Sequence, residues 1–250
     1  LTVFLKYGRL YLKFTQLGCL STSGENKNSL KARGNKMDIR NLLGRTILYY
    51  DGGTGTYLQK HGLKGGEIPE TWNIKRPQLI TAMHEEFLNA GSNIILCNTF
   101  GANDFKFEGT EYTTEKIIEA AVFNARKAVS NHAQNTKEDY VGNRFVSLDI
   151  GPLGKLLKPL GELEFEDAYN MFKKIAVTGE KAGADLVTIE TMNDVYEMKA
   201  AVLAVKENTK LPIFVTLTLD ERGKTLTGTD AEIEVAIFEG LGVDALGVNC

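Results

Sequence analysis

Short apolar runs alternate with longer segments of helical periodicity from residue 47 to the end of the sequence, and this alternation constrains the fold most. The apolar runs that read as strands are 47–50, 93–100, 144–150, 185–191, 212–219 and 244–250. The predicted helices are 77–90, 113–132, 165–182, 195–207 and 230–241, the last with Asp230 as its N-cap. Strands that alternate with helices pair in parallel, so the sequence predicts an α/β fold.

Two α/β architectures suit this pattern, a (β/α)₈ TIM barrel and a doubly wound sheet. The glycine-rich segment Asp51–Thr56 follows the first strand, but it opens with an acid where a phosphate would bind, which disfavours a nucleotide site. A complete barrel of ~250 residues or more needs two further strand–helix units. We therefore expect a (β/α)₈ barrel over residues 37–250, truncated after strand 6; an intact six-stranded sheet is the alternative.

The distribution of charge separates the first 36 residues from the rest. They hold seven Lys or Arg and one acid, whereas the other residues carry a net charge of −9. This net negative charge disfavours nucleic acid as a partner, because it repels the phosphates. Because Met37 is the first methionine, we expect residues 1–36 to be disordered. They would be either a transit peptide or a leader that is wrongly included ahead of a true translation start at Met37. No apolar run is long enough for a membrane span, and the three scattered cysteines favour a reducing, cytoplasmic location.

Polar residues stand where the predicted strands end, at the edge where barrel enzymes carry their chemistry. They are Asp51, Asn98, Thr99, Asp149, Glu190, Thr191, Thr216, Thr218, Asn249 and Cys250. Since no strand ends in Lys and none carries His, Schiff-base chemistry and a histidine base are disfavoured. Carboxylates beside glycine N–H groups suit an amino-acid substrate. Cys250 suits a soft metal, whereas we expect Cys97 to be a buried apolar side chain.

Several of these segments, taken together and in this order, resemble a known family. They are Asp51–Thr56, Pro69–Glu70 with Asn73–Ile74, Ala90–Ile95, Asn98–Ala102, Asp149–Gly154, Pro159–Gly161, Glu190–Thr191, Leu226–Asp230 and Gly247–Cys250. The chain resembles homocysteine S-methyltransferase domains over about residues 38–250, and within that family the homocysteine-binding domain of cobalamin-dependent methionine synthases.

The resemblance implies a substrate, a metal and a role for each matching residue. The substrate would be L-homocysteine, with Asp51 and Glu190 holding its ammonium. The carboxylate would meet the backbone of Gly52, Gly53 and Thr54, while Asn98, Thr99 and Asn249 would shape the pocket and the layer of residues directly behind it. The family binds zinc through three cysteines; the first matches Cys250, and the other two form a Cys-Cys pair on strand 8, which this sequence does not contain.

The activity implied is zinc-dependent methyl transfer to the homocysteine thiol, giving L-methionine. The donor would be methylcobalamin charged from methyltetrahydrofolate, on folate- and cobalamin-binding modules of the same full-length chain. The alternatives are an S-methylmethionine- or betaine-dependent homocysteine methyltransferase, and a non-catalytic homocysteine-binding fragment. Because two zinc ligands of the family are missing, we expect this chain alone to be inactive.

Overall fold

The computed structural model describes residues 2–6, 9–13, 37–135 and 144–250. Strands β1 (Thr2–Lys6) and β2 (Arg9–Lys13) pair antiparallel, which differs from the disorder expected of these residues. The remainder of the expected leader, including Cys19, lies outside the described residues. Within the described part of the chain, no helix combines the length and apolarity that crossing a membrane requires.

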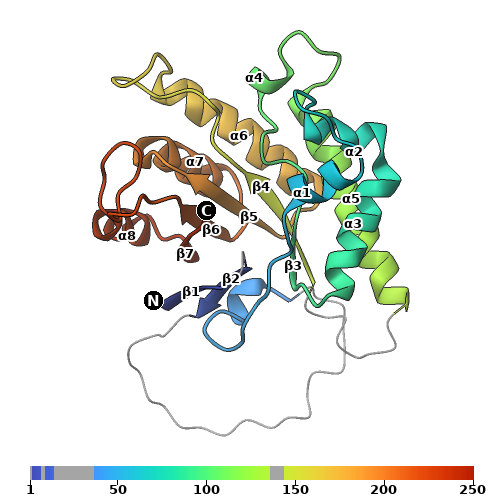
Figure 1. The fold of residues 1–250 in the computed structure, drawn as a ribbon. Helices are drawn as coiled ribbons and strands as arrows, with labels where there is room; N and C mark the ends of the chain where they lie inside the picture. Colours follow the sequence, from blue (N-terminus) through green and yellow to red (C-terminus); the bar gives the residue numbers. More distant parts are fainter. Residues whose placement is uncertain (1, 7–8, 14–36, 136–143) are drawn as a thin grey trace, which may run out of the picture.

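The centre of the fold is a parallel sheet of five strands (Figure 1). In spatial order they are β3 (Ile94–Leu96), β4 (Phe145–Ile150), β5 (Leu186–Met192), β6 (Ile213–Leu217) and β7 (Ala245–Val248). Every strand pairs with its successor in the sequence, as in a barrel, whereas a doubly wound sheet reverses its order partway. The predicted parallel α/β fold is confirmed. Over the described residues the sheet is open, with five strands in place of the six expected.

The missing strand is the first one predicted, 47–50. Tyr50 forms a single parallel bridge with Ile94, and the backbone N–H of Asp51 donates to the Ile94 carbonyl at 3.0 Å. Pairing goes no further because the chain turns at Gly52 and Gly53 and enters helix α1 (Thr54–Lys60). The segment nevertheless lies beside β3, so it delivers Asp51 to the same sheet edge as the other strand ends.

The predicted helices are confirmed with small changes at their ends. They are α3 (Pro77–Asn89), α5 (Thr114–Asn135), α6 (Phe165–Ala182), α7 (Val195–Asn208) and α8 (Ala231–Gly240). Shorter helical segments precede α3 or, in the case of α4, lie between α3 and α5: η1 (Ile39–Asn41), η2 (Pro69–Thr71), α2 (Trp72–Lys75) and α4 (Asp104–Phe107). Asp230 stands at the N-cap position of α8, but its side chain makes no capping hydrogen bond and instead pairs with Lys224 at 2.8 Å.

Two apolar clusters flank the sheet. The larger lies between the sheet and the helices, where Phe172 of α6 is fully buried. The smaller cluster contains one residue from each of the five strands, together with Ile39, Leu48 and Tyr50. The strand residues are Ile94, Phe145, Leu186, Phe214 and Ala245. Residues from the first and last of these strands share one cluster, so the sheet curves around it as a barrel wall does. The strand residues of this inner cluster lie at the amino ends of their strands, away from the edge where the carboxyl ends lie.

His84 is an unusual polar residue in the helical layer. It lies on α3, is fully buried, and neither of its ring nitrogens has a hydrogen-bond partner. Burial lowers the pKa of His84 to about 4, so the ring is neutral in the folded protein at pH 7. Its unfolded pKa is about 6.5, so the unfolded chain takes up the proton first as the pH falls. The contribution of His84 to stability is complete above pH ~6.5 and declines toward pH 4.

We predict that acidification from pH 7 to pH 5 costs the protein about 2 kcal/mol of unfolding free energy through His84. The measurement is urea unfolding at several pH values for the wild type and for His84→Leu. Buried carboxyl groups titrate in both proteins, so the difference between the two curves isolates His84. Parallel curves for the two proteins would contradict this assignment.

Candidate active site

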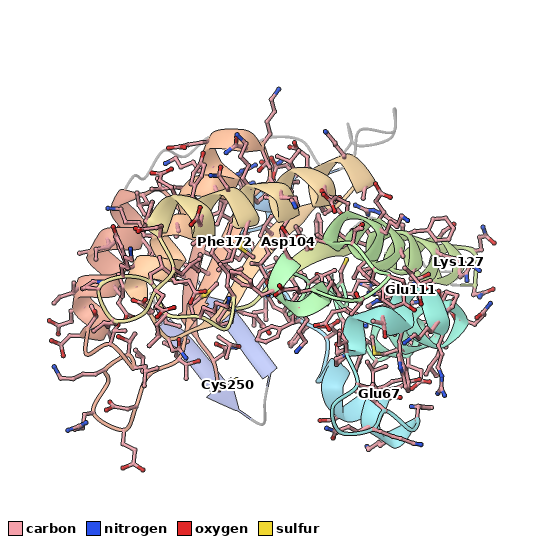
Figure 2. All side chains as sticks on the ribbon, turned by 90° about the horizontal axis from the view of Figure 1, so that it is seen from above. Glu67, Asp104, Glu111, Lys127, Phe172 and Cys250 are labelled. Atoms are coloured by element: carbon pink, nitrogen blue, oxygen red, sulfur yellow. The ribbon has the colours of Figure 1, made fainter. Side chains whose placement is uncertain are left out.

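A cavity of about 560 Å³ opens at the carboxyl ends of the strands. All the site residues expected from the sequence line it except Thr99, namely Asp51, Gly52, Gly53, Thr54, Asn98, Glu190, Asn249 and Cys250. A second cavity, of about 670 Å³, lies beside α4 and α6 and contains none of these residues. Figure 2 labels one residue of each cavity, Cys250 and Asp104, which lie well apart. The strand-end cavity is the candidate site because the polar strand ends meet there.

Asp51 is held at the wall of this cavity by the strand beside it. Its Oδ2 accepts a hydrogen bond from the Leu96 N–H at 2.8 Å, while its Oδ1 is buried without a protein partner. Gly52 follows in close contact with Phe87, since a Cβ at this position would lie 2.7 Å from the Phe87 ring. The glycine therefore allows the chain to pass the ring and keep Asp51 at the cavity.

Two further carboxyl groups belong to the cavity. Asp149 ends β4, and sequence reasoning had placed it on the rim without assigning it to the substrate. Glu70 comes from η2, a loop segment that no strand-end rule can locate; its Oε1 accepts from the Gly101 N–H at 2.7 Å. One oxygen of each, Asp149 Oδ1 and Glu70 Oε2, is buried without a hydrogen-bond partner. The cavity thus has acceptors left over for a ligand.

Thr99 and Asn98 hold the site together. The Thr99 hydroxyl donates to the Asp149 carbonyl at 2.8 Å and accepts from the Asp149 N–H at 3.2 Å, so Thr99 fixes Asp149 from outside the cavity. The Asn98 side chain donates to the Pro69 carbonyl at 2.9 Å. This bond ties the η2 loop, and with it Glu70, to the end of β3. Thr99 therefore does not line the cavity and contacts it only through Asp149.

The electrostatics of the cavity favour a cationic ligand. Burial raises the pKa of Asp51 and of Asp149 well above the usual aspartate range, and the charges of Glu190, Asp51 and Glu70 raise that of Asp149 further. Burial also raises the pKa of Glu190 to about 7. No Lys or Arg is among the described residues that line the cavity. An ammonium group entering here would relieve the repulsion and favour the ionised carboxylates.

Cys250 stands at the rim of the cavity as an exposed thiol, with its Sγ 3.9 Å from the Thr191 hydroxyl. Over the described residues no group of three or more His, Cys, Asp or Glu is placed to hold a metal ion. The donor chemistry of Cys250 fits zinc, but these residues do not complete a zinc site. Cys97 is buried in the core as expected, and burial raises the pKa of its thiol.

Comparison with known proteins identifies the class to which this fold and cavity belong. The family model described as homocysteine S-methyltransferase matches residues 48–250, which include every strand of the parallel sheet. The chain belongs to the homocysteine S-methyltransferase family, and the resemblance found in the sequence is confirmed.

Two curated relatives and two solved structures place the chain more closely. It is 30% identical over 226 residues to the methionine synthase of Mycobacterium leprae (strain TN) and 27% identical over 226 residues to that of Mycobacterium tuberculosis. These matches cover 85% of this chain and 18% of each relative, so the chain spans under a fifth of their length.

The solved structures are forms of the homocysteine methyltransferase MmuM from Escherichia coli, and they show the fold. The metallated form superposes with a TM-score of 0.75 at 23% identity, covering 85% of this chain and 77% of that one. The apo form gives 0.66 at 24% identity, covering 80% and 71%. The parallel α/β sheet is therefore shared with that enzyme.

We predict that Glu190 is one of three glutamates that titrate near pH 7 in the ligand-free protein, because burial also raises the pKa of Glu197 and of Glu234 to about 7. The test is ¹³C NMR of the glutamate side-chain carboxyl carbons between pH 5 and 9. One of the titrating signals should disappear in Glu190→Gln, and all should persist in Glu166→Gln, which alters an exposed residue on α6. An unchanged set of titrating signals in Glu190→Gln would contradict the prediction.

Proposed function

We propose that this domain binds L-homocysteine in the strand-end cavity and presents its thiol to a methyl donor, giving L-methionine. The observation that carries the proposal is a cavity with four carboxyl groups and no lining Lys or Arg, in a chain of the homocysteine S-methyltransferase family. The excess of acceptors suits the ammonium of an amino acid.

The chain's own residues would bind and orient the substrate. Glu190 and Asp51 would accept hydrogen bonds from the ammonium, each contact to a charged partner contributing about 1.5–3 kcal/mol. The backbone of Gly52, Gly53 and Thr54 lines the same cavity and would receive the carboxylate. These two anchors would leave the thiol directed toward the rim, where Cys250 lies.

Cys250 is our proposed zinc ligand within this chain. Zinc bound by thiolates would hold the substrate sulfur as a thiolate, which is the nucleophile that methyl transfer requires. The described residues supply one such ligand, so we derive no step through the metal. This chain alone would then lack activity, and at most bind homocysteine.

The methyl donor is proposed from the relatives. The chain matches proteins named methionine synthase over 18% of their length, which leaves most of each relative for other functions. We propose methylcobalamin as the donor, charged from methyltetrahydrofolate on folate- and cobalamin-binding modules of the same protein, in the cytoplasm. S-methylmethionine and betaine are the alternative donors.

In the full-length protein, we expect methionine to form from L-homocysteine and methylcobalamin but not from S-methylmethionine or betaine. Glu190→Gln should raise the homocysteine KM at least 10-fold, since the ammonium loses a charged partner worth about 1.5–3 kcal/mol. Methionine is quantified by mass spectrometry over a range of homocysteine concentrations. An unchanged homocysteine KM in Glu190→Gln would show that Glu190 does not bind the ammonium. Methionine formation with S-methylmethionine but not with methylcobalamin would show that S-methylmethionine is the donor.

Zinc content gives a separate test of Cys250. We expect purified full-length protein to hold about one zinc ion per chain, and Cys250→Ser to lose at least nine-tenths of it because a thiolate ligand is removed. Cys97→Ala is the matched control, since the Cys97 side chain is buried in the core and does not line the cavity, so its loss should leave zinc content unchanged. Full zinc content in Cys250→Ser would refute the assignment.

A further inference from the structure

Strand β5 is irregular at the residues that reach the cavity. Ile189 pairs with Val215 and Met192 pairs with Leu217, so two residues of β5 stand opposite the single residue Thr216 of β6. The two are Glu190 and Thr191, and the irregularity is a β-bulge. Consecutive side chains of a regular strand point to opposite faces, yet Glu190 and Thr191 both line the cavity. Thr188 also lines the cavity, so alternation along the strand already directs Glu190 there, and the bulge adds Thr191 to the same face.

The bulge needs a backbone conformation that Thr191 disfavours. Thr191 has a φ of +58°, in the left-handed region, and β-branched residues are rare there because their Cβ substituents crowd the backbone. Such a conformation persists only when surrounding groups hold it, and it occurs most often at functional sites. A partner that stabilises Thr191 should therefore be present nearby.

That partner is Asn249, which follows strand β7. Its Oδ1 accepts from the Thr191 N–H at 3.1 Å, and its Nδ2 donates to the Thr191 hydroxyl at 2.8 Å. The backbone N–H of Asn249 donates in turn to the Leu217 carbonyl at 3.1 Å, which anchors it to the end of β6. The Asn249 side chain thus pairs with both the backbone N–H and the hydroxyl of Thr191, across the end of strand β6.

We propose that Asn249 is a positioning residue: its reciprocal hydrogen bonds to Thr191 hold the β5 bulge and the peptide group between Glu190 and Thr191, and so fix where the Glu190 side chain lies in the cavity. The inference rests on the proposed function in taking Glu190 as the ligand of the homocysteine ammonium. Asn249 itself need not touch the substrate.

Because Asn249 precedes Cys250 in the chain, we infer that it also helps to select substrates by their length. Asn249 is bonded to Cys250, which marks the thiol end of the proposed site, and through Thr191 it fixes Glu190 at the ammonium end. Its position therefore sets the separation between the two groups. We therefore expect a ligand with one methylene fewer, such as L-cysteine, to bind less tightly than homocysteine, since one methylene is typically worth 10- to 200-fold in discrimination.

The test measures binding of L-homocysteine and L-cysteine to the full-length protein by calorimetry. Asn249→Ala should raise the homocysteine Kd at least 10-fold and raise the cysteine Kd by less, so that the variant discriminates less between the two amino acids. Adding Thr191→Gly should recover most of that loss, because glycine adopts a positive φ without hydrogen bonds to hold it. Asn208→Ala is the matched control: the Asn208 side chain likewise makes two hydrogen bonds, both as donor, but lies at the end of α7 outside the cavity.

Unchanged homocysteine binding in Asn249→Ala, or a double variant that binds no better than Asn249→Ala, would overturn the inference. Crystal structures of the ligand-free wild type and Asn249→Ala give a readout that needs no substrate. We expect Thr191 to leave the left-handed region in the variant, and a retained positive φ would overturn the positioning role. If wild-type protein binds no homocysteine while Thr191 shifts as expected, the proposed function fails and the positioning role stands.

Discussion

The sequential parallel pairing of the strands is the constraint on which the rest of the structure depends. Each strand lies beside its successor, and side chains from Tyr50 to Ala245 share one inner cluster, so the sheet must curve. Curvature brings the carboxyl ends of all these strands to one rim. Residues as distant in the sequence as Asp51 and Cys250, which are 199 positions apart, therefore line one cavity.

Gathering acids at that rim works against stability. Asp51 and Asp149 each bury a carboxyl oxygen without a partner, and burial of such groups costs free energy unless they are neutral or paired. The raised pKa values of both residues show that the folded protein favours their protonated forms. A cationic ligand supplies the missing partner, which makes the same unfavourable arrangement a means of recognition.

The site also shows how local regularity gives way where a side chain must be redirected. A regular β5 would place Glu190 and Thr191 on opposite faces, and the bulge puts both on the cavity. Thr191 is retained in a conformation that glycine would adopt more easily, and its hydroxyl has a partner in Asn249 that glycine would lack. The hydrogen bonds across the sheet outweigh the local preference of the residue.

The sequence by itself determined the helices, the parallel strands and most of the rim, because the helical and strand periodicities and the polar strand ends are local signals. Asp51, Glu190 and Asn249 were found in this way together with the family motifs. Tertiary structure alone decided three points. Segment 47–50 pairs through a single bridge because the chain turns at once into α1; Glu70 reaches the cavity because Asn98 ties its loop to β3; and Thr99 holds Asp149 from outside the cavity. Each depends on a contact between residues distant in the sequence, which no local pattern encodes.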